Sequence, residues 1–156
     1  MAAVARLLIV HHTPSPATVD LFDAVVNGAH HPDITGVEVV RRAALAATAS
    51  DLLAADAVVL GTPANIGYMS GALKHFFDTV FHVCADDTRD LPYGLYVHGN
   101  LDLAGAVRSV ESIAGGMGWR RVAPVVEVRG APDAAAREAC SELGSLLAAT
   151  IMPSSR

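Results

Sequence analysis

Length, composition and charge exclude several classes of protein. The chain has 156 residues, of which 52% are hydrophobic, and a formal net charge of −5. This length predicts a single domain spanning residues 1–156, and so high a hydrophobic fraction is typical of a sheet that is covered on both faces. The basic residues are scattered along an acidic chain, so we expect no nucleic-acid partner.

The sequence carries no sign of export or of membrane insertion. Its longest apolar tract, 43–61, is interrupted by two aspartates, and the apolar core near the N-terminus, 7–10, is too short for a signal peptide. Cys84 and Cys140 are far apart and fit neither a C-x-x-C redox pair nor a zinc ribbon. We expect both to be buried or half-buried thiols in a reducing compartment. These features predict a soluble, cytoplasmic protein that has no membrane partner.

Five segments are predicted strands, and in chain order they are 4–10, 37–40, 57–60, 93–98 and 121–128. The first and third are continuous apolar runs, which are typical of strands buried on both faces of a parallel sheet. We expect Gly61-Thr62-Pro63 to end the third strand, because Pro63 has no amide hydrogen to give to the ladder. Pro124 interrupts the fifth segment, which predicts an edge or bulged position there.

Segments with helical periodicity separate these strands. They are a helix that opens near Thr18 and ends near Gly28, a short helix within 43–54, an apolar stripe over 73–81, another over 107–117, and a last helix capped by Asp133. Strands that alternate with helices predict an α/β doubly wound fold, a three-layer sandwich around a five-stranded parallel sheet of order 2-1-3-4-5. Ligands of such sheets bind beyond the carboxyl ends of the strands at the topological switch, here between the first and third strands. The loops 12–18 and 62–70 follow those two strands, so we expect function there.

The second of these loops opens a dense motif that runs from Gly61 to Asp78. Its pattern is G-T-P-x-x-x-G-x-M-S-G-x-L-K-x-F-x-D. This pattern resembles the flavin-contacting loop of the flavodoxin-like family, especially its quinone-reductase and NAD(P)H-dependent FMN reductase members. The resemblance implies non-covalent FMN, whose ribityl chain and ring would be lined by Pro63, Ala64, Asn65, Ile66, Gly67 and Tyr68. We expect Lys74 and Asp78, four residues apart, to form an ordinary exposed helix pair.

The first loop, T-P-S-P-A-T at 13–18, resembles the phosphate-binding loop of the same family. The resemblance implies that Thr13, Ser15, Ala17 and Thr18 hold the FMN phosphate, helped by the partial positive charge of a helix N-terminus. Pro16 stands where the family usually has glycine and removes an amide donor, and Ala17 replaces the usual asparagine and removes a side-chain donor. The alternative is a capped helix start, with Ser15 or Thr18 as the N-cap.

Histidines are the remaining candidates for chemistry. His98, Gly99 and Asn100 end the fourth strand, and the resemblance assigns them to the pyrimidine side of the flavin. His11 and His12 are neighbours on a strand and point to opposite faces, so they are poorly placed to share a metal ion and are expected to pack or to form hydrogen bonds. We predict no metal site and assign no catalytic residue.

The resemblance implies an FMN-binding oxidoreductase that passes electrons from NAD(P)H, a transient donor, to a quinone or another small acceptor. In such proteins the cofactor supplies the redox chemistry, and the protein supplies position and electrostatics. Two alternatives remain open: a one-electron carrier flavodoxin, and a flavodoxin-fold protein that has lost FMN. The identity of the acceptor, the choice between NADH and NADPH, and the formation of a homo-oligomer also remain open.

Overall fold

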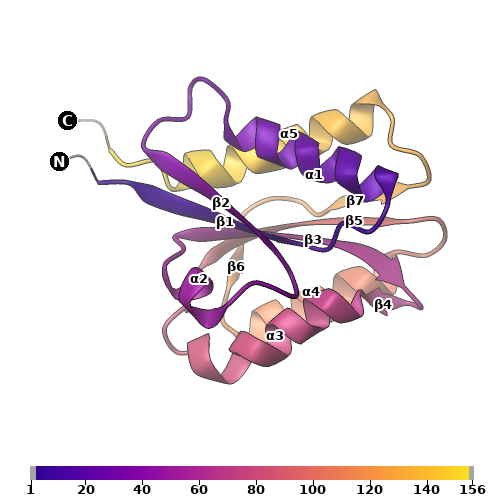
Figure 1. Ribbon diagram of the computed structural model, residues 1–156, viewed down its shortest axis with the longest axis horizontal. Helices are drawn as coiled ribbons and strands as arrows, with labels where there is room; N and C mark the ends of the chain where they lie inside the picture. The colour runs from indigo at the N-terminus through magenta and orange to yellow at the C-terminus, as the bar shows by residue number, and fades with distance from the viewer. Residues whose placement is uncertain (1–2, 155–156) are drawn as a thin grey trace.

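The structure is a computed structural model that describes residues 3–154. Its central sheet lies between two helical layers, with α1 and α5 on one face and α2, α3 and α4 on the other (Figure 1). The strands are β1 (Ala5–His11), β2 (Val37–Ala43), β3 (Ala57–Asn65), β4 (Tyr68–Met69), β5 (Pro92–Gly99), β6 (Arg120–Arg121) and β7 (Val126–Arg129). The helices are α1 (Pro16–Ala29), α2 (Ala49–Leu53), α3 (Gly71–Cys84), α4 (Ala104–Gly116) and α5 (Ala134–Thr150).

The order of the strands confirms the predicted doubly wound topology. The parallel sheet runs β2-β1-β3-β5, and β6 and β7 both pair with β5 on its far side. The predicted fifth strand is thus two short strands, which leave residues 122–125 between them. Pro124 lies in that gap, as expected of a residue that cannot donate to the ladder.

The predicted end of the third strand is wrong, because β3 continues through Pro63 to Asn65. The pairing of β1 with β3 ends at the pair His11 and Gly61, whereas β5 pairs with β3 as far as Pro63. Pro63 therefore pairs with a strand on one side only, that of β5, and a proline is tolerated where a strand has such an open side. The chain then turns back into β4, so part of the expected 62–70 loop is a short hairpin.

Two buried cores, one on each face of the sheet, hold the layers together. Alternate residues of β1 and β3, such as Leu8 and Val58, pack with α3 and α4, whereas Leu7 and Val59 pack with α1 and α5. All four side chains are fully buried. Both faces of these strands are thus covered, which explains their continuous apolar runs. Both cysteines are buried, as the sequence predicts.

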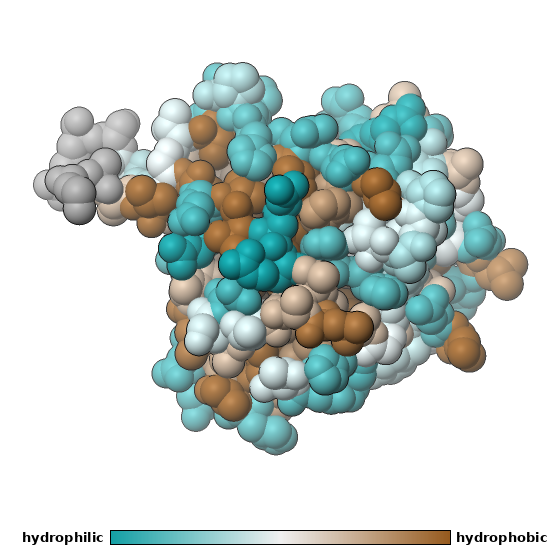
Figure 2. All heavy atoms as spheres, viewed as in Figure 1, coloured by the Kyte–Doolittle hydropathy of each residue, from teal (hydrophilic) through white to brown (hydrophobic). Residues whose placement is uncertain are grey.

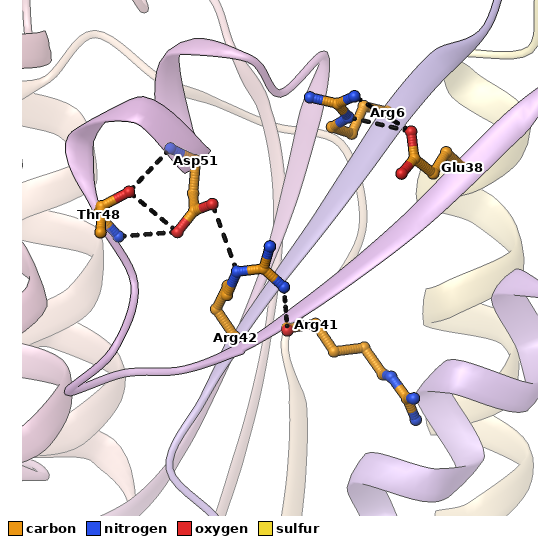
Figure 3. A network of polar contacts seen from close by, with 6 residues as sticks. All are labelled: Arg6, Glu38, Arg41, Arg42, Thr48 and Asp51. Atoms are coloured by element: carbon orange, nitrogen blue, oxygen red, sulfur yellow. Dashed lines mark hydrogen bonds and ion pairs between the residues drawn. The ribbon is translucent and has the colours of Figure 1, made fainter.

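Polar contacts tie the edge strand β2 to its neighbours (Figure 3). Arg6 on β1 pairs with Glu38 on β2 at 3.2 Å, and Nε of Arg42 lies 3.3 Å from a carboxylate oxygen of Asp51. Asp51 also accepts hydrogen bonds from the backbone amide and the hydroxyl of Thr48, which is the N-cap of α2. Pairs this exposed contribute about 0–1 kcal/mol each. They fix the position of the edge more than they stabilise the fold.

The surface is mixed in character. Strongly hydrophilic residues gather at the centre of the view in Figure 2, and isolated hydrophobic residues protrude at the end where β3 turns into β4 (Figures 1 and 2). Lys74 and Asp78 form the expected exposed pair on α3, with 2.6 Å between nitrogen and oxygen. None of the helices formed within residues 3–154 combines the length and the apolar character that a membrane crossing needs.

Candidate functional site

A cavity of about 440 Å³ lies at the carboxyl ends of β1, β3 and β5, where the sequence places the site. It is lined by Pro14, Ser15, Pro16, Ala17, Pro63, Ala64, Asn65, His98, Gly99, Asn100, Gly130 and Ala131. These residues come from the loops or strand ends that follow β1, β3, β5 and β7. The volume is within the range of about 300–1,000 Å³ that is typical of small-molecule sites.

The cavity brings together eight of the thirteen residues that the sequence assigns to the site. They are Ser15, Ala17, Pro63, Ala64, Asn65, His98, Gly99 and Asn100. Ile66 and Gly67 line an adjoining cavity of about 370 Å³, which shares Ala64, Gly99 and Asn100 with the first. Among the described residues, Thr13, Thr18 and Tyr68 line neither of these two cavities. Whether any of the thirteen contacts a ligand stays a prediction.

The first loop forms a capped helix start with Ser15 as the N-cap. The Ser15 side chain accepts a hydrogen bond from the Thr18 amide at 3.2 Å, and the Thr18 hydroxyl accepts one from the Ser15 amide at 3.0 Å. The Thr18 hydroxyl also donates to the Ser15 carbonyl oxygen at 3.0 Å, and its residue is only 2% exposed. The Thr18 hydroxyl is therefore already hydrogen-bonded to the backbone of Ser15, both as acceptor and as donor.

His11 packs beneath the same loop. Its ring stacks on Phe22 with 3.9 Å between centroids, and its Nδ1 forms a hydrogen bond with the hydroxyl of Thr13. Burial, together with the neighbouring charges of Arg41 and His12, lowers the pKa of His11 from 6.5 to about 4. His11 is therefore neutral at physiological pH, and it holds the Thr13 hydroxyl against the end of β1. No cluster of three potential metal-ligating side chains occurs within residues 3–154.

This shift in the pKa of His11 predicts a pH-dependent stability. The unfolded chain takes up a proton at His11 near pH 6.5, whereas the folded chain does so only near pH 4. The contribution of His11 to the free energy of unfolding is thus complete above pH 6.5 and is lost as the pH falls towards 4. Urea unfolding across this range should show a smaller decline for His11→Gln than for the wild type. His75→Gln, at an exposed position on α3, is the control and should keep the wild-type profile. Identical profiles for His11→Gln and the wild type would contradict the prediction.

The second loop ends in a tight two-residue turn between β3 and β4. Ile66 and Gly67 both have positive φ, of 51° and 72°, as a type I′ hairpin turn requires. Glycine adopts this conformation freely, but a β-branched isoleucine does so only under strain. The Ile66 side chain is fully exposed, so no packing of its own compensates for that strain. Strained residues of this kind cluster at ligand sites.

The base of the hairpin, in contrast, is held firmly. The Met69 amide donates to the Ser109 hydroxyl of α4 at 3.1 Å, and the Ser70 amide donates to the Thr62 hydroxyl at 3.0 Å. A Cβ added at Gly105 would lie 2.0 Å from the Gly67 carbonyl oxygen, so the turn rests directly on the backbone of α4. This exposed turn thus stands on a fixed support.

The loop that follows β7, which includes Gly130 and Ala131, also lines the cavity, and the sequence analysis did not predict this. Nε2 of His98 donates a hydrogen bond to the Gly130 carbonyl oxygen at 2.8 Å, and the Gly130 amide donates to the Gly99 carbonyl oxygen at 3.0 Å. His98 therefore fixes the wall of the cavity formed by Gly130 and Ala131. The signal that could have revealed this wall is the position of Gly130-Ala131-Pro132 just after a parallel strand, because such strands end at the same edge of the sheet.

The cavities are close to neutral. Within the described residues, the only charged side chain in the two lining sets is that of Asp102, in the adjoining cavity. Neither lysine nor arginine lines either cavity in that part of the chain. A ligand there would be held by backbone groups, by the amides of Asn65 and Asn100, and by small apolar surfaces.

Comparisons with known proteins agree with this architecture. No protein family model matches the chain. Over 77 residues the chain is 32% identical to a flavodoxin of Aquifex aeolicus, and the match covers 49% of this chain and 40% of that protein. The chain thus spans less than half the length of this curated relative.

Solved structures resemble the chain over nearly its whole length. A flavodoxin of Streptococcus pneumoniae superposes with a TM-score of 0.79 at 21% identity, covering 94% of this chain and 100% of that one. A WrbA-like flavodoxin of Agrobacterium tumefaciens gives 0.76 at 19% identity, with 94% and 96% covered. The two-electron reduced flavodoxin of Megasphaera elsdenii gives 0.77 at 18% identity, with 92% and 98% covered. At these identities the likeness establishes the fold, which is flavodoxin-like, as the sequence predicts.

Proposed function

We propose that this protein of flavodoxin-like fold binds FMN non-covalently in the 440 Å³ cavity and transfers electrons from NAD(P)H to a quinone or another small acceptor. The observation that carries the proposal is the convergence of the loops after β1, β3 and β5 on one neutral cavity at the topological switch. Ligands of open α/β sheets bind at this place. The flavodoxin and WrbA-like relatives support the same class of ligand.

The lining of the cavity fits a flat, largely uncharged ring. Ala64 and Gly99 bring small surfaces close together, since a Cβ added at Gly99 would lie 3.3 Å from Cβ of Ala64. The side-chain amides of Asn65 and Asn100 supply donors and acceptors at the same cavity. Narrow apolar walls with a few amides suit the alternating polar edge of an isoalloxazine ring.

The chain's own residues would bind and orient the flavin, which when bound supplies the redox chemistry. His98 has its Nε2 hydrogen committed to the Gly130 carbonyl oxygen, so we assign it to the wall of the cavity and not to proton transfer. We propose no catalytic side chain.

The absorbance spectrum of the purified protein, with the released cofactor identified, tests flavin binding. We expect a yellow protein from which FMN is released on denaturation. If the protein is colourless, titration of added FMN against the quenching of its fluorescence replaces the spectrum. A colourless protein that does not quench added FMN would contradict the proposal and support the alternative in which the fold has lost FMN.

Steady-state kinetics separates an enzyme from a carrier. We expect the flavin-loaded protein to oxidise NADH or NADPH when a quinone is present. The second candidate, a one-electron carrier flavodoxin, is favoured by the names of the curated relative and of several structural neighbours. A protein that binds FMN but turns over neither nucleotide would overturn the reductase and support the carrier.

A further inference from the structure

We infer that this site recognises the ring and the polyhydroxyl chain of a flavin but gains little from its terminal phosphate, so that riboflavin and FMN bind with similar affinity. The inference rests on the proposed function, because it requires a flavin in the cavity. It follows from three properties of the chain around the start of α1: its amides, its hydroxyls and its charges.

Few amides at the start of α1 remain free to bind an anion. A helix N-terminus binds phosphate through the amides of its first turn that have no acceptor. Pro16 has no amide hydrogen, and the Thr18 amide already donates to the Ser15 hydroxyl at 3.2 Å. The Val19 amide donates to the Ser15 carbonyl oxygen at 2.9 Å. Within the part of the chain that the structure describes, this leaves the Ala17 amide as the free donor of the turn.

The hydroxyls of the loop are committed in the same way. The Thr18 hydroxyl donates its hydrogen to the Ser15 carbonyl oxygen, and the Thr13 hydroxyl bonds to Nδ1 of His11. Of the three hydroxyls that the sequence assigns to a phosphate, Ser15 alone lines the cavity. Its oxygen also caps the Thr18 amide. The Ser15 hydroxyl also lies 3.0 Å from the Thr18 hydroxyl, which gives its own hydrogen to the Ser15 carbonyl oxygen, so a phosphate would compete with that contact for the Ser15 hydrogen.

The charges nearby also fail to favour a phosphate dianion. A hollow lined by Pro16, Ala17 and Ala131 adjoins the cavity, and the carboxylates of Asp20 and Asp23 line it as well. Asp20 is paired with Arg137 at 3.3 Å, whereas Asp23 forms no ion pair within residues 3–154. A phosphate at the start of α1 would thus lie near a carboxylate, and the described residues that line the cavity and this hollow include neither lysine nor arginine.

Titrations of the protein with riboflavin and with FMN, followed by flavin fluorescence, test the inference without any assay of turnover. A single free amide and a shared hydroxyl predict dissociation constants within about tenfold of each other. We also expect FMN affinity not to fall as ionic strength rises, because the described lining residues include no lysine or arginine whose attraction for the phosphate could be screened.

Adding hydrogen-bond donors at positions 16 and 17 should make the protein bind FMN more tightly than riboflavin. The double variant Pro16→Gly/Ala17→Asn adds one amide hydrogen and one side-chain amide, and should tighten FMN by about tenfold or more while leaving riboflavin unchanged. Ala135→Asn introduces the same side chain at an exposed position in the first turn of α5, outside the residues that line the cavity and the hollow beside it, and should leave both affinities unchanged.

Two outcomes would overturn the inference, and they differ in what else they overturn. A wild-type protein that binds FMN more than about tenfold tighter than riboflavin contradicts the inference but leaves flavin binding intact. A protein that binds neither flavin contradicts the proposed function, and the inference with it. The wild-type comparison alone decides the matter if the double variant does not fold.

Discussion

Gly28→Ala is expected to lower the free energy of unfolding by about 3 kcal/mol, the upper part of the usual range for overpacking. Gly28 lies in the last turn of α1, where that helix packs beside α5 (Figure 1). A Cβ at this position would lie 1.9 Å from the Ser141 carbonyl oxygen and 2.8 Å from the Ser141 Cα. Both atoms belong to the backbone, so a rotamer change cannot relieve the overlap.

The backbones of α1 and α5 also approach each other closely at Gly144 on α5. A Cβ at Gly144 on α5 would lie 2.1 Å from the Val25 carbonyl oxygen, and the Ser145 hydroxyl donates to the Gly28 carbonyl oxygen at 2.8 Å. The two helices must therefore move apart if Gly28 gains a side chain. Because the start of α1 carries Ser15 and α5 follows the wall formed by Gly130 and Ala131, that movement also separates two sides of the cavity.

Thermal and urea unfolding measure the effect, with Gly115→Ala as the matched control. Gly115 lies in the last turn of α4, and a Cβ there meets no atom within 4 Å. The free energy of unfolding of the control should rise by about 0.5–1 kcal/mol, because alanine favours a helix more than glycine does. For a chain of this length, a loss of 3 kcal/mol lowers the melting temperature by roughly 6–12 °C. Equal stabilities for the two variants would show that the helices adjust without cost.

Local patterns in the sequence were enough to predict the sheet and the position of the main candidate cavity. The apolar run 57–60 is buried on both faces, and the rule that ligands bind at the switch point led directly to the loops after β1 and β3. The positive φ of Gly67 fits its place in a turn. In each case the residue's own chemistry, or its spacing from near neighbours, decides the structure.

Features that depend on distant parts of the chain were not predictable in this way. β3 continues past Gly61 because β5 pairs with it as far as Pro63 and β4 pairs with Ala64 and Asn65, which the sequence around Pro63 does not reveal. The wall at Gly130 exists because β7 pairs with β5 and His98 reaches across. Only the three-dimensional register brings such partners together.

The loop at 13–18 was ambiguous for a different reason. Hydroxyl residues at the start of a helix serve equally well to cap it and to bind an anion, because both tasks use the same amides and oxygens. Here Ser15 and Thr18 satisfy each other. Pro16 supplies a fixed φ that suits a helix start but no donor for a ligand. Which task prevails is a question of geometry that the sequence pattern alone leaves open.

Gly105→Ala is expected to weaken flavin binding by about tenfold, which corresponds to about 1.4 kcal/mol, with a smaller effect on the fold. The added Cβ would lie 2.0 Å from the Gly67 carbonyl oxygen and 2.8 Å from its carbonyl carbon. The turn at Ile66 and Gly67 must then rise from α4. These two residues line the cavity that adjoins the first one, so the displacement changes the shape of the proposed site.

The matched control is Gly71→Ala. Gly71 is the first residue of α3 and follows β4 almost directly. Gly105 is likewise near a helix start, as the second residue of α4. A Cβ at Gly71 meets no atom within 4 Å, so this variant changes a helix start near the same hairpin without moving the hairpin. We expect it to keep the wild-type affinity for FMN.

Melting temperatures with and without FMN separate an effect on the site from an effect on the fold. A ligand that binds only the folded chain raises stability according to its concentration relative to the dissociation constant, so a defect in the site shows mainly in the rise that FMN produces. For Gly105→Ala we expect that rise to shrink while the melting temperature of the free protein changes less. A variant that keeps the full rise would show that the hairpin at Ile66 and Gly67 takes no part in holding the flavin, because its displacement would then leave the ligand contacts unchanged.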